Sequence, residues 1–105
     1  MDPKTRLQYE ARTRILRALA HPSRLFILDV LSHGQRNVSE LTELVGADPS
    51  TVSRHLSVLK GVGLVRDEKH GANVFYEIQT PCVLNFFGCV EAVIKERSRL
   101  QSELI

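Results

Sequence analysis

The stretch that decides the fold is residues 39–62, SELTELVGADPSTVSRHLSVLKGV. Its second half repeats apolar residues at helical spacing: Val52, Leu56 and Leu59 stand at i, i+4 and i+7. These three side chains therefore share one helix face, which we expect to be buried. The first half is also amphipathic, and a glycine separates the two. The stretch predicts two short helices joined by a tight turn, the helix-turn-helix arrangement.

The opposite face of the second helix is polar. At 100° per residue it carries Ser50, Arg54, Ser57, Val58 and Gly61, with Thr51 and Ser53 beside it. Asp48 and Pro49 suit the N-cap and the first helical position. Hydroxyl side chains are indifferent helix formers, so their clustering favours a contact over an ordinary solvated surface. Short hydroxyls let a helix approach phosphates and base edges, and Arg54 can pair with guanine or phosphate. The face predicts a helix that lies in the DNA major groove.

A β-hairpin is predicted directly after this helix. Residues 63–66 and 74–78 are β-prone, and the polar segment 67–73 between them contains glycine and asparagine. A hairpin in this position is a wing, and Lys69 and His70 lie at its predicted tip. A charged tip is often only solvated, but its place behind a helix-turn-helix favours contact with DNA.

Three further helices are expected around this centre. They cover about residues 5–20, residues 22–34 and a long final segment that Pro81 opens and that runs to about residue 102. Asn37 and Glu40 form a capping-box pattern that opens the first helix of the helix-turn-helix. The predicted core face of the helix over 22–34 carries Leu25, Leu28 and Leu31.

The two terminal helices carry more apolar surface than one small core can bury. The first has the stripe Leu7, Ala11, Ile15, Ala18 and Leu19, and the last has Val83, Leu84, Phe86, Phe87, Val90, Val93 and Ile94. An excess of exposed apolar surface indicates a partner. A monomeric core that absorbs both stripes is the alternative.

Three segments of the chain resemble the ArsR/SmtB family of small winged-helix repressors. They are ALAHPSRL at 18–25, STVSRHL at 50–56, and GLV at 63–65 followed by wing residues Gly71 and Tyr76. The resemblance covers nearly the whole chain from about residue 11. It implies a mostly α winged helix-turn-helix fold, with four helices, a β-hairpin wing and a fifth helix.

The resemblance also implies a homodimer that binds double-stranded operator DNA, with half-sites about one helical turn apart. The candidate DNA-binding residues are Ser50, Thr51, Ser53, Arg54, Ser57, Lys69 and His70. The candidate dimer interface, on the first and last helices, consists of Leu7, Ala11, Ile15, Phe86, Phe87, Val90, Val93 and Ile94.

Composition agrees with one DNA-binding domain over residues 1–105. The chain is 43% hydrophobic and 25% charged, which is ordinary for a soluble protein, and its net charge of +2 is by itself weak evidence for nucleic acid. No apolar segment suggests a membrane span or a signal peptide, so a cytoplasmic protein is expected. No glycine elbow, phosphate loop or metal motif supports an enzyme. A winged-helix protein-interaction module remains the alternative of another class.

The two cysteines, Cys82 and Cys89, are predicted to lie on the final helix, seven residues apart. Seven residues span roughly 10 Å along a helix, too far for an intrachain disulfide, although a second copy can supply the missing reach. Two interpretations stay open: small apolar residues of the interface, or a sensor of trivalent arsenic, thiophilic metals or oxidising sulfur and oxygen species. One metal site of the family uses a Cys-x-Cys pair, and this chain has Asn37 and Ser39 at the corresponding positions. Another uses Asp and His pairs on the last helix, and the last helix predicted here has no histidine. Zinc and nickel are therefore disfavoured as effectors. A constitutive regulator without an inducer is a further alternative.

Overall fold

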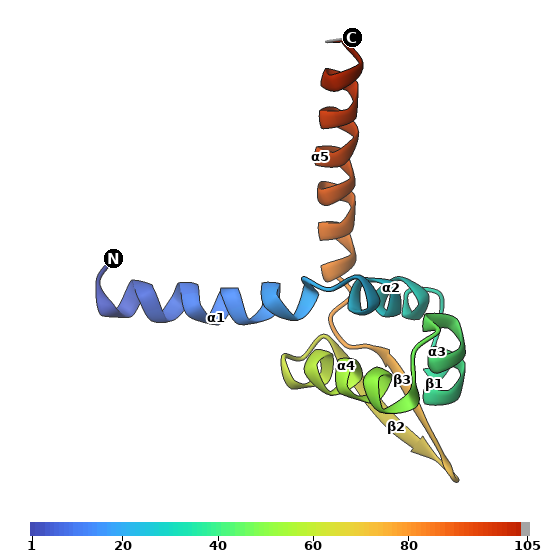
Figure 1. Ribbon diagram of the computed structural model, residues 1–105. Helices are drawn as coiled ribbons and strands as arrows, with labels where there is room; N and C mark the ends of the chain where they lie inside the picture. The colour runs from blue at the N-terminus through green and yellow to red at the C-terminus, as the bar shows by residue number, and fades with distance from the viewer. Residues whose placement is uncertain (104–105) are drawn as a thin grey trace.

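The computed structural model describes residues 1–103 and contains five helices and three short strands (Figure 1). The helices are α1 (Pro3–Leu19), α2 (Pro22–Leu31), α3 (Val38–Val45), α4 (Pro49–Gly61) and α5 (Val83–Glu103). The strands are β1 (Arg36–Asn37), β2 (Val65–His70) and β3 (Asn73–Ile78). The predicted order of four helices, a hairpin and a last helix is confirmed.

Helices α3 and α4 form the helix-turn-helix, and local hydrogen bonds fix both of their starts. The N–H of Glu40 donates to Asn37 Oδ1 at 2.8 Å, and the N–H of Asn37 donates to Glu40 Oε1 at 3.1 Å, so the predicted capping box is present. Gly46 ends α3 in the left-handed conformation, with φ of 75°. Asp48 caps α4 and Pro49 is its first residue, as predicted.

The core lies between α2, α3, α4 and the base of the wing. Val52, Leu56 and Leu59 are fully buried, which confirms the predicted apolar face of α4. They meet the buried side chains Ile27, Leu28, Leu31, Leu41, Leu64 and Val65, with Ala18 and Leu19 from the end of α1. Val58, which the helical wheel put on the outward face, is half-buried and packs against this core. The polar face of α4 is therefore narrower than predicted.

Helix α2 departs from its prediction in two respects. Leu25 was expected in the core but is 37% exposed, while Ile27 is fully buried. The buried face of α2 is centred between Ile27 and Leu31, which leaves Leu25 at its margin. The helix also ends at Leu31 with Ser32 as its C-cap, so Gly34, with φ of 136°, belongs to the turn that leads to β1.

The sheet has the strand order β1-β3-β2 and is antiparallel throughout. In the wing, β2 and β3 extend to a pair between His70 and Asn73, so that Gly71 and Ala72 alone form the turn. Most of the polar segment 67–73 is therefore strand rather than loop. The two-residue turn is possible because Gly71 adopts a positive φ. Strand β1, which pairs with Tyr76 and Phe75, was not predicted.

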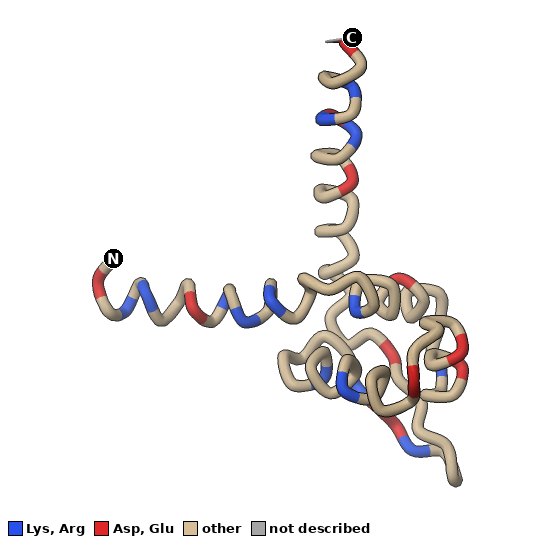
Figure 2. The backbone as a smooth tube through the Cα atoms, viewed as in Figure 1, with Lys and Arg blue, Asp and Glu red and all other residues tan. Residues whose placement is uncertain are grey.

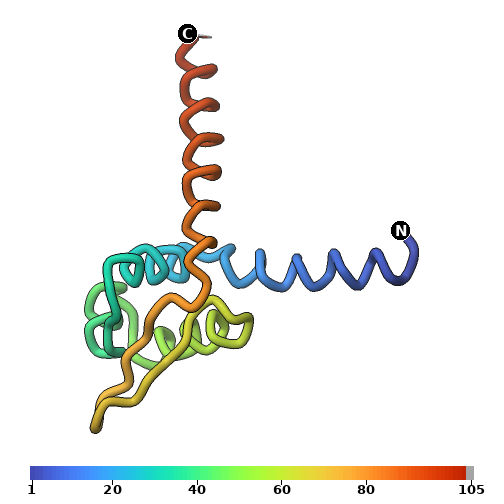
Figure 3. The backbone as a smooth tube through the Cα atoms, turned by 180° about the vertical axis from the view of Figure 1, so that it is seen from behind, coloured from blue at the N-terminus to red at the C-terminus, as the bar shows by residue number. Residues whose placement is uncertain are grey.

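Helices α1 and α5 extend from the body in different directions (Figures 1 and 3). Helix α1 begins two residues before the predicted start and ends one residue earlier than predicted. Helix α5 begins at Val83, and Pro81 and Cys82 lie in the turn before it, where the N–H of Val83 donates to the carbonyl of Thr80. None of the α5 residues given a burial class is buried. No helix in the described part of the chain is long and apolar enough to cross a membrane.

Candidate nucleic-acid interface

The N-terminus of α4 is organised by the Asp48 carboxylate. It accepts hydrogen bonds from the N–H of Thr51 at 2.9 Å and from the hydroxyls of Ser50 and Thr51. The Ser50 hydroxyl is the largest cause that lowers the Asp48 pKa to about 2, followed by the two bonds from Thr51. Two of the predicted DNA-binding hydroxyls are therefore part of the helix cap, a role that the sequence prediction did not assign to them.

The next residues along the outward face are free. Ser53, Arg54 and Ser57 are exposed, and within residues 1–103 their side chains form no hydrogen bond or ion pair. Because Val52 and Leu56 anchor the opposite side of α4 in the core, these three side chains point away from the protein body. Figure 2 shows the cations of α4 on the same part of the molecule as the charged wing. This face therefore presents two hydroxyls and a guanidinium that are exposed and have no partner among residues 1–103.

Two ion pairs involve residues of the wing, one formed by Lys60 near the end of α4 and one by Arg66 of β2. Lys60 Nζ lies 2.9 Å from Asp67, and Arg66 Nε lies 2.6 Å from Glu77. Lys69 is exposed and, within the described residues, has no carboxylate partner. Lys69 is thus the wing cation best able to reach a phosphate.

His70 lies in a different environment from Lys69. Its Nε2 lies 3.5 Å from Glu68 Oε2, and its ring packs edge-on against Phe75, with centroids 5.4 Å apart. The structure therefore gives His70 an intrachain acidic neighbour that a phosphate would have to compete with.

A buried histidine behind this face was missed in the sequence analysis. His55 is 9% exposed, its ring centroid lies 4.4 Å from that of His21, and its Nδ1 has no hydrogen-bond partner among residues 1–103. Desolvation lowers the pKa of His55, and the charges of His21, Arg24 and Arg54 lower it further. The burial of His55 could have been predicted from the sequence, because this residue follows Val52 by three positions and so lies beside the apolar face of α4.

His21 connects this cluster to α2. It is the N-cap of the helix, and its Nδ1 accepts a hydrogen bond of 3.1 Å from the N–H of Ser23. Arg24 contributes a buried Nε that also has no hydrogen-bond partner in the described part of the chain. The outward face of α4 is therefore backed by the contact between the His55 ring and the His21 ring at the start of α2.

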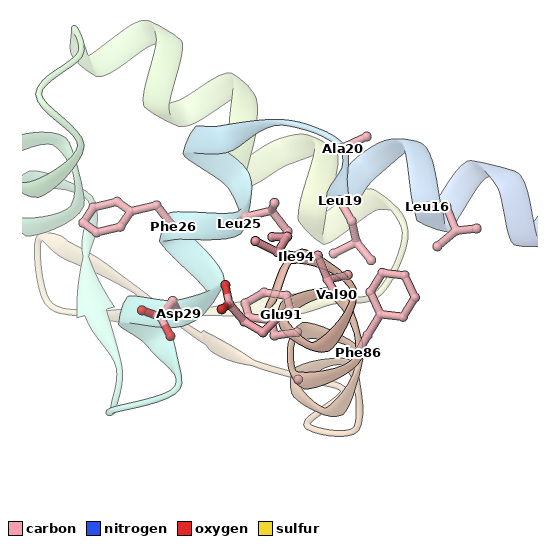
Figure 4. Close-up of a pocket in the computed structure, with 12 residues that line it drawn as sticks. Leu16, Leu19, Ala20, Leu25, Phe26, Asp29, Phe86, Val90, Glu91 and Ile94 are labelled. Atoms are coloured by element: carbon pink, nitrogen blue, oxygen red, sulfur yellow. The ribbon is translucent and has the colours of Figure 1, made fainter. Parts of the chain in front are cut away.

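Half of the candidate interface residues line an open groove between α1, α2 and α5, with a volume of about 720 Å³ (Figure 4). Phe86, Phe87, Val90 and Ile94 line the groove, and Phe87 also packs against the core. The other predicted members lie outside it: Leu7, Ala11, Ile15 and Val93. Leu7 and Val93 are each about two-thirds exposed, at 66% and 67%. The protomer thus leaves both apolar stripes largely uncovered.

The cysteines are free thiols, and both are exposed. Cys89 lies on α5, but Cys82 lies in the turn before the helix, so the prediction that both are on the helix is wrong for Cys82. The helical spacing therefore does not set the distance between the two sulfurs. No group of three or more metal-ligating side chains gathers in residues 1–103.

A capped helix-turn-helix with a free polar recognition face, followed by a β-wing, defines a winged helix-turn-helix DNA-binding domain. The model of the bacterial regulatory protein ArsR family matches residues 21–67. The HTH-type transcriptional regulator Rv0324 of Mycobacterium tuberculosis is 36% identical over 83 residues. That match covers 79% of this chain but only 37% of Rv0324.

Two solved structures are similar over most of their length. NolR from Sinorhizobium fredii has a TM-score of 0.82 at 29% identity, covering 89% of this chain and 93% of NolR. The homodimeric winged helix-turn-helix DNA-binding domain Mb0332 from Mycobacterium bovis has a TM-score of 0.78 at 31% identity, covering 92% and 90%. The chain belongs to the ArsR family of helix-turn-helix transcriptional regulators.

Proposed function

We propose that this chain represses transcription by binding double-stranded operator DNA as a homodimer. One observation carries the proposal: the outward face of α4 holds Ser53, Arg54 and Ser57, which have no side-chain partners among residues 1–103, on a helix whose other face is anchored in the core. Such a helix enters the major groove without any rearrangement of the fold. Rv0324 and Mb0332 are described as transcriptional regulators, which fits a protein without catalytic activity.

The contacts divide into two kinds. Arg54 is the residue suited to read a base, because a guanidinium pairs bidentately with guanine. Ser53 and Ser57 are short donors for phosphates or base edges, and Ser50 and Thr51 contribute from the capped N-terminus, where backbone N–H groups favour phosphate. Lys69 and His70 of the wing hold the DNA backbone.

Dimerisation completes the domain, which we take to span residues 1–105. Helices α1 and α5 expose apolar stripes that one protomer does not cover, and Mb0332 is described as a homodimer. The interface is formed by Leu7, Ala11, Ile15, Phe86, Phe87, Val90, Val93 and Ile94. A twofold axis through these helices presents two α4 helices to successive major grooves.

A thiol-directed effector is the finer part of the proposal. Cys82 and Cys89 are exposed at the base and along one side of the dimerising helix α5. A thiophilic ligand such as trivalent arsenic, or oxidation by a sulfur or oxygen species, would alter the packing of α5 and so the separation of the α4 helices. A ligand acts this way only if it binds the DNA-incompetent state more tightly. A regulator without an inducer is the alternative outcome of the test.

The experiment is a mobility shift with the DNA upstream of the protein's own coding sequence. Wild type should shift this fragment more tightly than unrelated DNA, and Arg54→Ala should lose that preference. Arg66→Ala is the matched control, because Arg66 is paired with Glu77 and lies off the α4 face. Equal binding of both DNAs by wild type would contradict operator recognition.

The effector arms add arsenite, or separately a persulfide donor, to wild type and to the Cys82→Ser and Cys89→Ser variants. Release of wild type but not of the serine variants supports thiol sensing. Release of all three alike, or of none, removes the thiols from the mechanism and leaves the DNA-binding proposal intact.

A further inference from the structure

Two carboxylates interrupt the apolar groove between α1, α2 and α5. Asp29 of α2 and Glu91 of α5 both line it, and Figure 4 shows them on the side away from Leu16. Their neighbours in the groove are apolar, among them Phe26 and Ile94. Within residues 1–103, neither carboxylate has a Lys, Arg or His partner.

A cation borders the apolar stripe of α1. Arg14 lies seven residues after Leu7 and three after Ala11, so at 100° per residue it falls at the edge of the stripe, about 20° beyond Leu7. It is exposed, and in the described part of the chain it forms no ion pair. A guanidinium on a face that dimerisation covers is costly to desolvate unless it meets a carboxylate.

We propose that each groove of the dimer receives α1 of the partner, with the partner's Arg14 paired to Asp29 and Glu91. The inference rests on the proposed homodimer and deepens it by naming the occupant of the groove. The groove and α1 are complementary, because the groove supplies apolar walls with two carboxylates and α1 supplies an apolar stripe with the Arg14 guanidinium at its edge. Arg14 is suited to this role because its planar guanidinium can bond two carboxylates at once.

The ion pairs make the interface specific for a second copy of this chain. Apolar stripes alone discriminate poorly among helices of similar size, whereas an unpaired buried charge penalises every wrong partner. A second copy of this chain brings an arginine to each pair of carboxylates. A related subunit without a cation at position 14 would leave both acids uncompensated.

The test uses charge reversal and mixing, followed by sedimentation velocity. One variant is Arg14→Glu, and the other combines Asp29→Lys with Glu91→Lys. Each alone should raise the dimer dissociation constant about tenfold or more, since each places like charges together at both symmetric contacts. An equal mixture should form heterodimers of near wild-type stability, because both contacts again join opposite charges. This rescue also shows that both variants are folded.

Two controls separate this proposal from the dimer itself. Arg6→Glu makes the same charge change on the side of α1 away from the apolar stripe, where Arg6 is exposed, and should leave the dimer intact. Phe86→Glu should dissociate any dimer that uses this groove. A wild-type dimer that Phe86→Glu breaks but the charge reversals do not would overturn the pairing alone. A monomeric wild type would overturn the pairing together with the proposed dimer.

Discussion

The winged-helix centre and the terminal helices of this chain differ in how far they bury their apolar side chains. In the centre, α2, α3, α4 and the base of the wing bury most of the side chains that their sequence periodicity marks as apolar, with Leu25 as an exception. In α1 and α5 the same kind of periodicity leaves Leu7, Val93 and Ile94 more than half exposed. An apolar pattern therefore predicts that a face is to be covered, but it does not say by which chain.

The first prediction tests this difference by removing a core side chain from the centre. Leu56→Ala should lower the free energy of unfolding by about 2–5 kcal/mol, because Leu56 is fully buried and its loss leaves a cavity. Val93→Ala, on the exposed face of α5, is the matched control and should change protomer stability little. Chemical denaturation at a concentration where the chain is monomeric measures both, and equal losses would contradict the division into two regions.

The second prediction concerns the uncovered surface. Phe86→Glu should produce monomers, with a loss of about 3 kcal/mol or more of association energy, since the new carboxylate would be buried without a partner. Phe86 is 44% exposed in the protomer, so the folding of the centre should be unaffected. Sedimentation velocity with circular dichroism separates the two effects. A variant that stays dimeric would move the interface away from this groove.

The third prediction sharpens the function of α4. Arg54→Ala should weaken specific operator binding by about 1–3 kcal/mol and relax the preference at one base pair. Fluorescence anisotropy on an operator duplex and on single-base variants measures both. Unchanged affinity and preference would remove Arg54 from base recognition.

The wing gives a smaller and different effect. Lys69→Ala should weaken binding to all sequences alike and reduce the slope of log K against log salt by about one unit, as expected for one lost phosphate contact. Lys60→Ala should change the slope less, because Lys60 is paired with Asp67. A selective loss at one operator sequence would show instead that the wing reads bases.

The smallest expected effect is the pH dependence that His55 confers on stability. Its pKa is lowered from the ordinary value of 6.5, so the folded state binds this proton less readily than the unfolded state. The free energy of unfolding should therefore fall as the pH drops below about 6.5 and flatten once it passes the folded pKa. Denaturation of wild type and His55→Gln between pH 5 and pH 8 measures this contribution. An identical pH dependence in the two proteins would contradict it.

The features predicted correctly from the sequence are those that neighbouring residues determine. The buried face of α4, the Asn37–Glu40 capping box and the Asp48–Pro49 helix start all depend on contacts within one or two helical turns. The wing was predicted because its β-prone runs and glycine lie together. The family and the winged helix-turn-helix fold followed from the same segments.

The errors concern contacts between distant segments. Strand β1 has only two residues and exists because it pairs with β3, about 40 residues later in the chain. Ile27, and not the predicted Leu25, is buried in the core because of the way α2 packs against α3 and α4. The tilted contact between the His55 and His21 rings joins α4 to the start of α2, and no local pattern predicts which residue a buried histidine contacts.

The most direct measurement of the central claim is an NMR titration of the isotope-labelled protein with its operator duplex. We expect the largest amide shifts at Ser53, Arg54 and Ser57 of α4, smaller ones at Lys69 and His70, and one duplex bound per two chains. Shifts confined to other surfaces, or binding of one chain per duplex with α4 unaffected, would contradict the account of a dimer that reads DNA through α4.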